Sequence, residues 1–485
     1  MTNSRVPDSL QSSHPMDWQQ AAGCLRQIVG SEHVLTGPDE LDRYSADALT
    51  PYRAYYADAA FDRLADVVVR PADTAQVSQI VALAQRMGVP LIPYGGGTGV
   101  MGGILPVRGG IILDLGRLNR VIDIDPVSQT AEVEAGLILQ DLYDALEPHG
   151  LMPGHDPYSV PIASVAGTIS TNGVGYRAAA YGPMGDQVVA LEVVLPDGRI
   201  IHTRPVPKQS SGPNLNHLFI GSEGVFGVIT RATLRVFRQP EAAEYATVEF
   251  ADFESGFAAV SEMAGLGIRP TLLDLTEDSE GVLLHLLFEG YREGVEAALR
   301  RTMSVCDEAG GWNVGPEPTM SYWKHRHDSA LNYRQTALGR PREERWQRQW
   351  GRTFDYLHMS LPADRVLEYR RRADRMLEAR KIKVVEYCLW SRPEFFSMLV
   401  VPDGDRRVVG RDGYDPEVRA NLAAGVDEVL TLAQDMGGVM EYCHGVGIKL
   451  HHLLGRELGV SRDALLDIKR ALDPAGVMNP GKLTL

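Results

Sequence analysis

The clearest chemical feature of this sequence is a glycine-rich stretch at residues 93–103, which reads Pro-Tyr-Gly-Gly-Gly-Thr-Gly-Val-Met-Gly-Gly. Glycine has no Cβ and tolerates positive φ, so successive backbone N–H groups in such a loop can surround one anion, typically a phosphate. A mobile surface loop is the alternative, but the apolar segments 89–92 and 111–113 on either side favour a buried turn. The stretch has neither the Gly-Lys-Ser/Thr of a Walker A loop nor the spacing of a dinucleotide fingerprint.

A second stretch, residues 153–185, is rich in small and hydroxyl-bearing residues and poor in charge. A long connection inside a compact domain is usually functional. Small residues let the backbone approach a flat ligand, and Ser and Thr hydroxyls can bond its polar atoms. A tightly packed connection without a ligand is an equally open interpretation.

Three side chains could act on a substrate. His444 precedes a Gly-Val-Gly turn, and an imidazole with an ordinary pKa near ~6.5 can remove a hydroxyl proton at neutral pH. A histidine that caps the turn is the alternative, and Tyr442 is a second candidate for proton transfer or binding. Arg326 could hold a carboxylate or phosphate with its planar guanidinium. Arg334 and Arg392 are weaker candidates, and a solvated helix face is the alternative for each arginine.

The elements that must position these residues fall into two groups. Before residue 240, short apolar strands alternate with helices, and Pro196-Asp197-Gly198 turns a hairpin. From residue 246 to 309 the order β-α-β-β-α is typical of a ferredoxin-like sheet with helices on one face. We therefore place a domain boundary near residue 240. Strands are expected at 66–71, 111–115, 121–124, 130–134, 188–195, 199–202, 232–237, 246–250, 271–275, 281–288 and within 384–401, and helices at 17–35, 75–87, 137–149, 253–266, 294–309, 366–380, 418–436 and 464–472.

Composition indicates a soluble globular protein that we expect in the cytoplasm. The 485 residues are 44% hydrophobic and carry a net charge of −15, which argues against nucleic acid or an anionic membrane as a partner. Residues 1–16 are polar and predicted to be disordered, and no signal peptide or membrane-spanning run is visible. The four cysteines form no CxxC pair, and His325 and His327 point to different faces of a helix, so no metal site is predicted.

Four segments in order, 93–103, 154–182, 193–198 and 221–230, resemble the FAD-binding domain of the vanillyl-alcohol oxidase/p-cresol methylhydroxylase superfamily. Residues 472–482 resemble the C-terminal signature of its FAD-linked oxidase branch, which includes D-lactate, glycolate and D-2-hydroxyglutarate dehydrogenases and alkyl-dihydroxyacetonephosphate synthase. The resemblance covers about residues 60–485. Within the branch, residues 154–159 and 443–447 look closest to the synthase subgroup.

The resemblance implies an α+β fold, in which a two-subdomain FAD-binding domain of the p-cresol methylhydroxylase type is joined to a ferredoxin-like antiparallel-sheet cap domain. The implied parts are a tail (1–16), the FAD-binding domain (17–240), the cap (241–430) and a C-terminal segment (431–485) that returns to the flavin.

The resemblance also implies FAD as the cofactor. We predict non-covalent attachment because the glycine loop lacks the histidine that is the superfamily's common attachment site. The loop would hold the pyrophosphate, residues 157–159 and 164–173 would line the adenosine-ribityl and isoalloxazine channel, and residues 223–229 would supply backbone contacts. The implied cofactor-binding residues are Pro93, Tyr94, Gly95, Gly96, Gly97, Thr98, Gly99, Gly102, Pro157, Tyr158, Ser159, Ser164, Gly167, Thr168, Ser170, Asn172, Gly173, Glu223, Gly224, Val228 and Ile229.

The implied activity is that of an FAD-dependent oxidoreductase acting on CH–OH groups. Flavin N5 would take hydride from an alcohol or 2-hydroxyacid-type substrate, with His444 as the base and Arg326 as the substrate arginine.

The sequence departs from the motifs of this family at two places. The His-x-Gly-Asp-Gly-Asn-x-His metal motif of the 2-hydroxyacid dehydrogenases is reduced to residues 401–405, without histidine. The synthase's catalytic tyrosine and triple histidine are replaced at 394–398 and 442–444. We therefore hypothesise another alcohol, and Trp390, Phe395, Phe396 and Tyr442 favour an aromatic one.

Three alternatives stay open: a non-redox flavoenzyme similar to the alkyl synthase, a catalytically degenerate FAD-binding protein, and glycine loops that bind no cofactor. Bleaching of the flavin by substrate would separate an oxidoreductase from the first two. The expected partners are a small-molecule substrate, an electron acceptor of unknown identity and a second copy in a homodimer. Neither nucleic acid nor a membrane span is expected.

Overall fold

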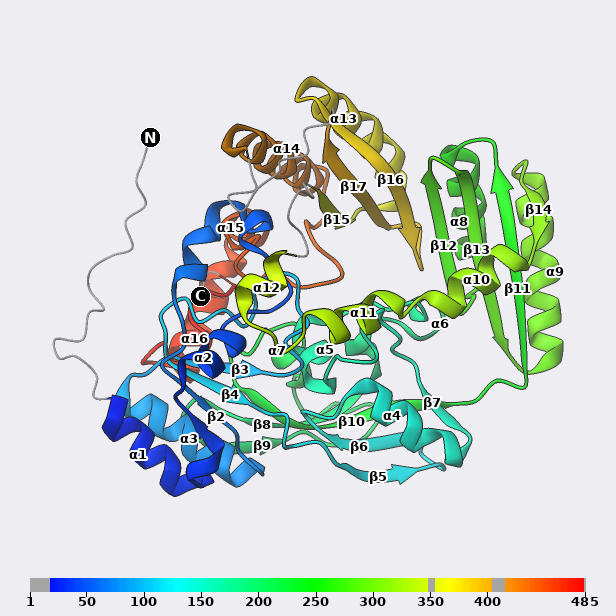
Figure 1. The fold of residues 1–485 in the computed structure, drawn as a ribbon. Coiled ribbons are helices and arrows are strands. Elements are labelled where there is room, and N and C mark those ends of the chain that lie inside the picture. The colour runs from blue at the N-terminus through cyan, green and yellow to red at the C-terminus, as the bar shows by residue number, and fades with distance from the viewer. Residues whose placement is uncertain (1–17, 348–353, 404–414, 484–485) are drawn as a thin grey trace.

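The structure is a computed structural model that describes residues 18–347, 354–403 and 415–483. Two sheets from the first half of the chain form the lower part of the molecule in Figure 1, and one wide sheet from the second half stands above them. The tail predicted at 1–16 lies outside the described residues.

The first sheet has four strands in the order β1-β2-β4-β3. Strands β2, β4 and β3 are parallel and almost wholly buried, which explains their continuous apolar sequence. Helix α3 begins where the Asp73 carboxylate accepts a hydrogen bond from the Gln76 N–H, and it ends at Gly88 in the left-handed region. The elements of this sheet are α1 (Trp18–Val29), β1 (Val34–Leu35), α2 (Pro38–Tyr44), β2 (Val67–Val69), α3 (Thr74–Met87), β3 (Leu91–Tyr94) and β4 (Ile111–Asp114).

The second sheet has six antiparallel strands, and the long strand β10 is its centre. β10 pairs with β6 on one side and with β8 on the other, while β7 pairs with its end. The apolar residues of both sheets form one core. The elements are β5 (Val121–Asp125), β6 (Thr130–Glu134), α4 (Leu139–Leu146), β7 (Leu151–Pro153), α5 (Val165–Thr171), α6 (Ala178–Tyr181), β8 (Val188–Val194), β9 (Ile200–His202), α7 (Asn216–Phe219) and β10 (Val228–Arg238).

The third sheet, which we call the cap sheet, has seven antiparallel strands in the order β14-β11-β13-β12-β16-β17-β15. Its first four strands have the order of a ferredoxin-like unit, and the β-α-β-β-α sequence then recurs from β15 to α14. The elements are β11 (Ala242–Phe250), α8 (Phe253–Gly265), β12 (Leu272–Asp278), β13 (Gly281–Gly290), α9 (Arg292–Glu308), β14 (Trp312–Gly315), α10 (Glu317–His325), α11 (Asp328–Thr336), α12 (Arg342–Gln347), β15 (Asp355–Ser360), α13 (Val366–Ala379), β16 (Ile382–Trp390), β17 (Phe395–Pro402) and α14 (Pro416–Asp435).

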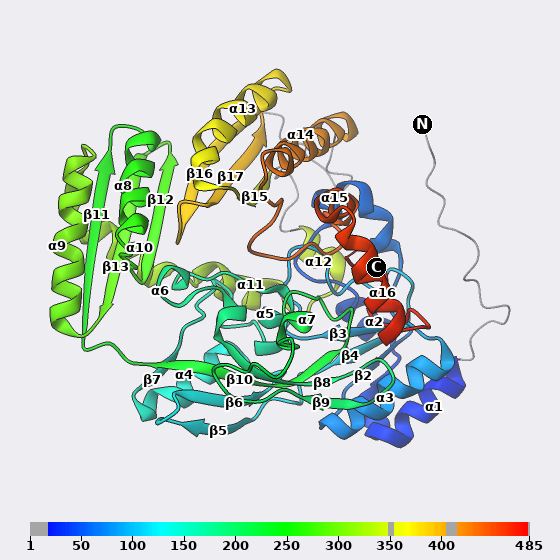
Figure 2. The ribbon, with the colours of Figure 1, turned by 180° about the vertical axis from the view of Figure 1, so that it is seen from behind.

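The two faces of the cap sheet differ. Helices α8, α9, α13 and α14 pack on one face and share an apolar core with it. The other face is turned toward the first and second sheets, and α10 and α11 lie between those two sheets and the cap sheet (Figures 1 and 2). This arrangement leaves the polar face of the cap sheet opposite the glycine loop.

The chain returns to the first sheet at its end through α15 (His451–Leu458) and α16 (Ser461–Leu472). The Leu91 N–H donates to the Val477 carbonyl, and the Asn479 N–H donates to the Leu91 carbonyl, so residues 477–479 add an edge to β3. In the described ranges, no helix is both long and apolar enough to cross a membrane.

Most predicted strands and long helices are present, but three expectations are wrong. The helix predicted over 17–35 ends at Val29, because Gly30 adopts a φ of 92°. The stretch 153–185, expected to be one long connection, contains α5 and α6. Helices α10, α11, α12 and α15 were not predicted, since their polar sequences show little helical periodicity.

Candidate active site

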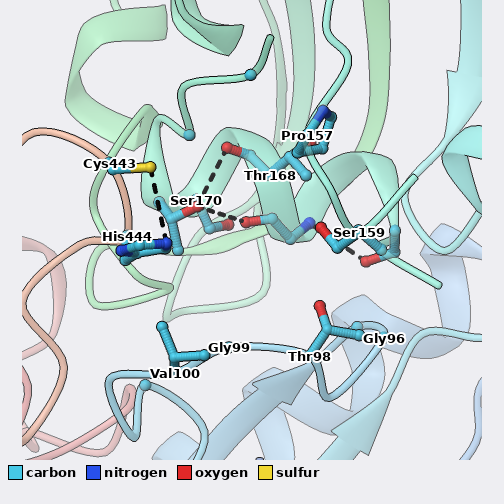
Figure 3. Close-up of a pocket in the computed structure, with 18 of the residues that line it drawn as sticks. Gly96, Thr98, Gly99, Val100, Pro157, Ser159, Thr168, Ser170, Cys443 and His444 are labelled. Carbon is cyan, nitrogen blue, oxygen red and sulfur yellow. Dashed lines mark hydrogen bonds between the residues drawn. The ribbon is translucent and has the colours of Figure 1, made fainter. Parts of the chain in front are cut away.

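One large cavity lies between the glycine loop and the cap sheet. Its volume is about 490 Å³, and its lining comes from both halves of the chain. Figure 3 shows Gly96, Thr98, Gly99 and Val100 on one side, Pro157, Ser159, Thr168 and Ser170 on the opposite side, and Cys443 with His444 at one end. The cavity is therefore a slot with a glycine-rich wall and a wall of small polar residues.

The first three glycines of the loop, Gly95, Gly96 and Gly97, pack so closely against neighbouring atoms that an added Cβ would clash. A Cβ on Gly96 would lie 2.3 Å from the Ile162 carbonyl oxygen, and one on Gly95 would lie 2.2 Å from Ser164 Oγ. Gly97 has a φ of +64°. Within the described part of the chain, no acceptor takes a hydrogen bond from the N–H groups of residues 96–101. Free N–H groups in a turn without Cβ atoms fit the pyrophosphate of a dinucleotide.

Helix α5 forms part of the opposite wall. The Ser164 side chain caps it by accepting from the Gly167 N–H, and it ends at Asn172, which has a φ of 50°. Gly167, Thr168 and Ser170 line the cavity. Helix α5, which has seven residues, therefore presents small side chains along the slot.

The Gly221–Ile229 segment closes one end of this wall through Glu223. The buried Glu223 carboxylate accepts from the N–H groups of Val446, at 2.6 Å, and Gly447, at 3.0 Å. Burial raises its pKa, and these N–H groups partly offset that rise. The Asn479 side chain donates to the carbonyls of Glu223 and Gly103. Glu223 and Asn479 thus tie the C-terminal segment and the His444 turn to the cavity wall.

His444 lies partly buried at the end of the cavity that faces the cap. Burial, followed by the positive charges of Arg53 and Lys449, lowers the pKa of His444 to about 4, so its imidazole is neutral at pH 7. Its Nδ1 lies 3.7 Å from a carboxylate oxygen of Glu441, which also accepts from the N–H groups of Cys443 and His444. A neutral imidazole can accept a proton.

A buried ion cluster supports this end of the cavity from behind. Asp355 accepts from Lys449 Nζ and from Arg53 Nη2, each at 2.7 Å, and from the Tyr55 hydroxyl at 2.8 Å. Burial alone would raise the pKa of Asp355, but the two cations hold it well below its usual range. Because this cluster carries one more positive than negative charge, it disfavours a proton on His444.

Arg326 lines the cavity but is already engaged with the protein. Its Nε donates to Asp156 at 3.1 Å, its Nη1 donates to the Trp323 carbonyl, and its guanidinium lies over the Trp323 ring. Asp156 also accepts from Arg177 and from His327 Nε2, and these partners lower the pKa of Asp156 to about 2 despite burial. Arg326 Nη2 also lies 3.1 Å from Asp156, so the cluster fixes the orientation of the guanidinium and leaves two of its five N–H groups to face a ligand.

The cap sheet contributes the third wall. Asp274, Tyr356, His358 and Trp390 line the cavity from strands β12, β15 and β16. Asp274 accepts from the Tyr322 and Thr276 hydroxyls, and burial raises its pKa to about 6. Among the described residues, no group of three or more His, Cys, Asp and Glu is placed to hold a metal ion.

Most of the residues predicted to bind the cofactor line this one cavity, although they come from three separate stretches. These are Pro93, Tyr94, Gly95, Gly96, Gly97, Thr98, Gly99, Pro157, Tyr158, Ser159, Ser164, Gly167, Thr168, Ser170, Gly173, Glu223, Gly224, Val228 and Ile229. His444 and Arg326 line it as well.

Three predicted site residues lie behind the cavity wall. The Gly102 N–H donates to Asp47, and its α-carbon faces Ile448 and Leu49. Asn172 ends α5 and accepts from the Gly185 N–H. Tyr442 stacks on Phe395 at 4.4 Å between ring centroids, and its hydroxyl meets Ser397 Oγ.

The aromatic residues proposed to favour an aromatic substrate are also divided. Trp390 lines the cavity, but Phe396 is fully buried in the cap core, where β17 meets α8 and α13. Arg392 lies beside Glu394 and Arg334 lies on α11, and neither lines the cavity.

Sequence reasoning missed Asp156, Asp274, Tyr356 and His358. A signal was present for the last two. Residues 355–360 alternate between polar and apolar, which places Tyr356 and His358 on one face of β15. Asp274 and Asp156 carried no such pattern, because residues far away in the sequence, such as Tyr322 and Arg326, make their surroundings.

Comparison with known proteins agrees with this geometry. Residues 65–204 match the family described as FAD binding domain, and residues 239–483 match the C-terminal domain of FAD linked oxidases. D-lactate dehydrogenase of Archaeoglobus fulgidus is 31% identical over 91% of this chain and 95% of its own. Glycolate oxidase subunit GlcD of Bacillus subtilis is 25% identical over 93% and 95%.

Solved structures share the fold. Alkyldihydroxyacetonephosphate synthase aligns with a TM-score of 0.75 at 18% identity, covering 98% of this chain and 88% of its own. p-Cresol methylhydroxylase aligns with a TM-score of 0.74 at 20% identity, covering 96% and 97%. The predicted fold class, a p-cresol methylhydroxylase-type flavin fold with a cap, is confirmed.

The chain therefore belongs to the FAD-linked oxidases. It is an FAD-dependent oxidoreductase, as the sequence predicted, and FAD is its cofactor. The glycine-rich slot, with its free N–H groups, suits this cofactor.

Proposed function

We propose that the protein oxidises the CH–OH group of a small alcohol or 2-hydroxyacid, with FAD held in the slot and the substrate between His444 and the cap sheet. The observation that carries this proposal is the position of the neutral, partly buried His444 at the cap end of the glycine-lined cavity. The names of the relatives, D-lactate dehydrogenase and glycolate oxidase, support this substrate class.

In this proposal residues 17–240 hold the cofactor, residues 241–430 form the cap, and residues 431–485 return His444 to the site. The N–H groups of residues 96–101 would hold the pyrophosphate, and residues 157–173 and 223–229 would flank the rest of the cofactor. The bound flavin supplies an acceptor for hydride at N5. Cytoplasmic location, non-covalent attachment and a homodimer stay predictions, and the electron acceptor stays unassigned.

His444 would accept the hydroxyl proton, since its imidazole is uncharged at neutral pH. Arg326 would orient the substrate or cofactor through its two uncommitted N–H groups, with Asp156 holding the guanidinium in place. Asp274 and Trp390 would border the non-reacting part of the substrate.

The test is anaerobic bleaching of the visible flavin absorption by D-lactate, glycolate and 4-hydroxybenzyl alcohol, each added to purified protein. Bleaching by one of these alcohols supports the proposal, and His444→Asn should lose it while keeping FAD. The matched control is His452→Asn, because His452 lies on α15, pairs with Asp427 and does not line the cavity.

If every member of the panel leaves the flavin oxidised, the proposal fails and the non-redox alternative gains weight. Bleaching by 2-hydroxyacids alone would contradict the aromatic-substrate hypothesis. Flavin that stays with the protein after acid precipitation would contradict non-covalent attachment.

A further inference from the structure

A second histidine, His358, packs against His444 in the cavity wall. The His358 and His444 ring centroids lie 4.7 Å apart with the rings at 66°. His358 projects from β15 and His444 from the C-terminal segment, so the two imidazoles approach the same space from different parts of the chain. Only 1% of His358 is exposed to solvent.

The two ring nitrogens of His358 have different surroundings. Nδ1 lies 2.8 Å from Ser397 Oγ, which lies 2.9 Å from the Tyr442 hydroxyl. Nε2 is buried and has no hydrogen-bond partner among the described residues. A buried polar nitrogen without a partner costs free energy, and a bound ligand can supply the missing partner.

The Ser397–Tyr442 pair indicates which nitrogen of His358 carries the proton. Burial raises the pKa of Tyr442 well above its usual value, so its hydroxyl keeps its proton and can donate to Ser397 Oγ. When Tyr442 donates to Ser397, which is one of the two directions that these contacts allow, Ser397 donates its own proton to Nδ1 of His358. With Nδ1 acting as an acceptor, the proton of the neutral ring sits on Nε2, the nitrogen without a partner among the described residues.

The polar face of the cap sheet offers a useful comparison. His285 is partly buried in the neighbouring strand, opposite Asp274, and its Nδ1 bonds to Thr319 Oγ1. His285 does not line the cavity. His358 therefore differs from His285 in its position, since the His358 ring lines the cavity and packs against the ring of the predicted base.

We propose that His358 is a second catalytic residue, whose Nε2–H donates a hydrogen bond to the reacting oxygen of the substrate while His444 removes that oxygen's proton. The proposal rests on the proposed function. The substrate C–H bond would break with its electron pair leaving as hydride to the flavin. The O–H bond would break with its proton passing to His444, and the C=O bond would form. His358 would keep its proton throughout and stabilise the negative charge that develops on oxygen.

Titratable and charged groups around His358 are consistent with a neutral donor. His444 lies in front of it, Tyr356 and Trp390 pack beside it, and Tyr442 packs at its edge. The cations Lys449 and Arg53 and the carboxylate of Asp355 complete its electrostatic surroundings. Burial and then the neighbouring His444 lower its pKa well below the usual value.

The first test measures the rate of anaerobic flavin reduction with the panel alcohol that bleaches the wild-type protein. His358→Ala should reduce this rate by ~10²–10³-fold, the loss typical of one donor to a developing oxyanion. Its FAD content should stay at the wild-type level, and His358→Gln, which keeps an N–H donor, should restore part of the rate. His285→Asn is the control, because His285 lies in the same sheet, is partly buried and does not line the cavity. Its rate of flavin reduction should stay within about threefold of wild type, since the ~10²–10³-fold loss is expected only for a donor to the developing oxyanion.

The second test needs no substrate. Selective ¹⁵N labelling of histidine, with the His358 signals assigned by their loss in His358→Gln, reports which ring nitrogen carries the proton. We expect a neutral ring protonated at Nε2 in the holoenzyme at pH 7, and we expect Ser397→Ala to perturb that state. Protonation at Nδ1 instead would overturn the donor role.

The outcomes separate the two proposals. If His444→Asn abolishes bleaching while His358→Ala reduces flavin at nearly the wild-type rate, the role of His358 is refuted and the proposed function stands. If no panel alcohol bleaches the wild-type flavin, the proposed function fails, and the proposal for His358 fails with it.

Discussion

Replacing Gly96 by alanine tests whether the glycine loop is shaped by close approach to residues 162–164. An added Cβ would lie 2.3 Å from the Ile162 carbonyl oxygen and 3.3 Å from the Ser164 N–H nitrogen. Both atoms belong to backbone that is held by α5, so a side-chain rotation cannot relieve the clash. The loop must instead move by about 1 Å to reach an ordinary contact distance.

Overpacking of this kind costs about 1–3 kcal/mol. We expect the displacement to fall on the loop, because its N–H groups lack protein partners, and therefore to weaken FAD binding. At about 1.4 kcal/mol per factor of ten, the dissociation constant for FAD should rise by roughly 5–150-fold.

The assay is titration of apoprotein with FAD, followed by quenching of flavin fluorescence, together with thermal unfolding of the apoprotein. The matched control is Gly23→Ala in α1, where a Cβ would meet no atom within 4 Å. Wild-type affinity in Gly96→Ala, with the apoprotein equally stable, would refute the assignment of this loop to the cofactor.

Three further predictions concern stability. Asp156→Asn should destabilise the protein by about 3 kcal/mol at pH 7, because it leaves buried cations uncompensated. The pKa of Asp156 is about 2 in the folded protein and about 3.9 in the unfolded chain. About 2 kcal/mol of stabilisation that is present above pH 4 should therefore be lost as the pH falls toward 2, and urea titrations at several pH values would measure this loss. His155 is the opposite case, because burial lowers its pKa to about 4 and the imidazole gains its proton first in the unfolded chain. As the pH falls from 6.5 to 4, the free energy of unfolding should fall by about 3 kcal/mol in the wild type and by less in His155→Gln. Asn479→Ala removes two hydrogen bonds to the cavity wall and should lower the unfolding temperature of the holoenzyme. An unchanged unfolding temperature would argue against a stabilising role of Asn479 between the C-terminal segment and the cavity wall.

The cofactor half of the site was accessible from sequence because its signals are local. A run of glycines, a helix cap such as Asp73 and an apolar strand are each encoded by neighbouring residues. The same locality explains why the ferredoxin-like order of the cap could be predicted over 246–309, where strands and helices alternate with clear periodicity.

The substrate half was less accessible because it depends on distant contacts. Arg326 looked like a free substrate arginine, yet Asp156, 170 residues away, binds it. Phe396 looked like a pocket residue, yet the register of β17 with β15 and β16 turns it into the core and turns its neighbour Ser397 toward His358. Such facts follow from strand pairing, which short sequence patterns do not specify.

The most direct test of the account is a deuterium isotope effect on anaerobic flavin bleaching. A panel alcohol that bleaches the flavin would be compared with the same alcohol deuterated at its carbinol carbon, under single-turnover conditions. The account predicts distinctly slower bleaching with the deuterated alcohol, because the C–H bond breaks as hydride leaves toward the flavin. Loss of flavin colour at the same rate with both alcohols, or no loss at all with either, would contradict it.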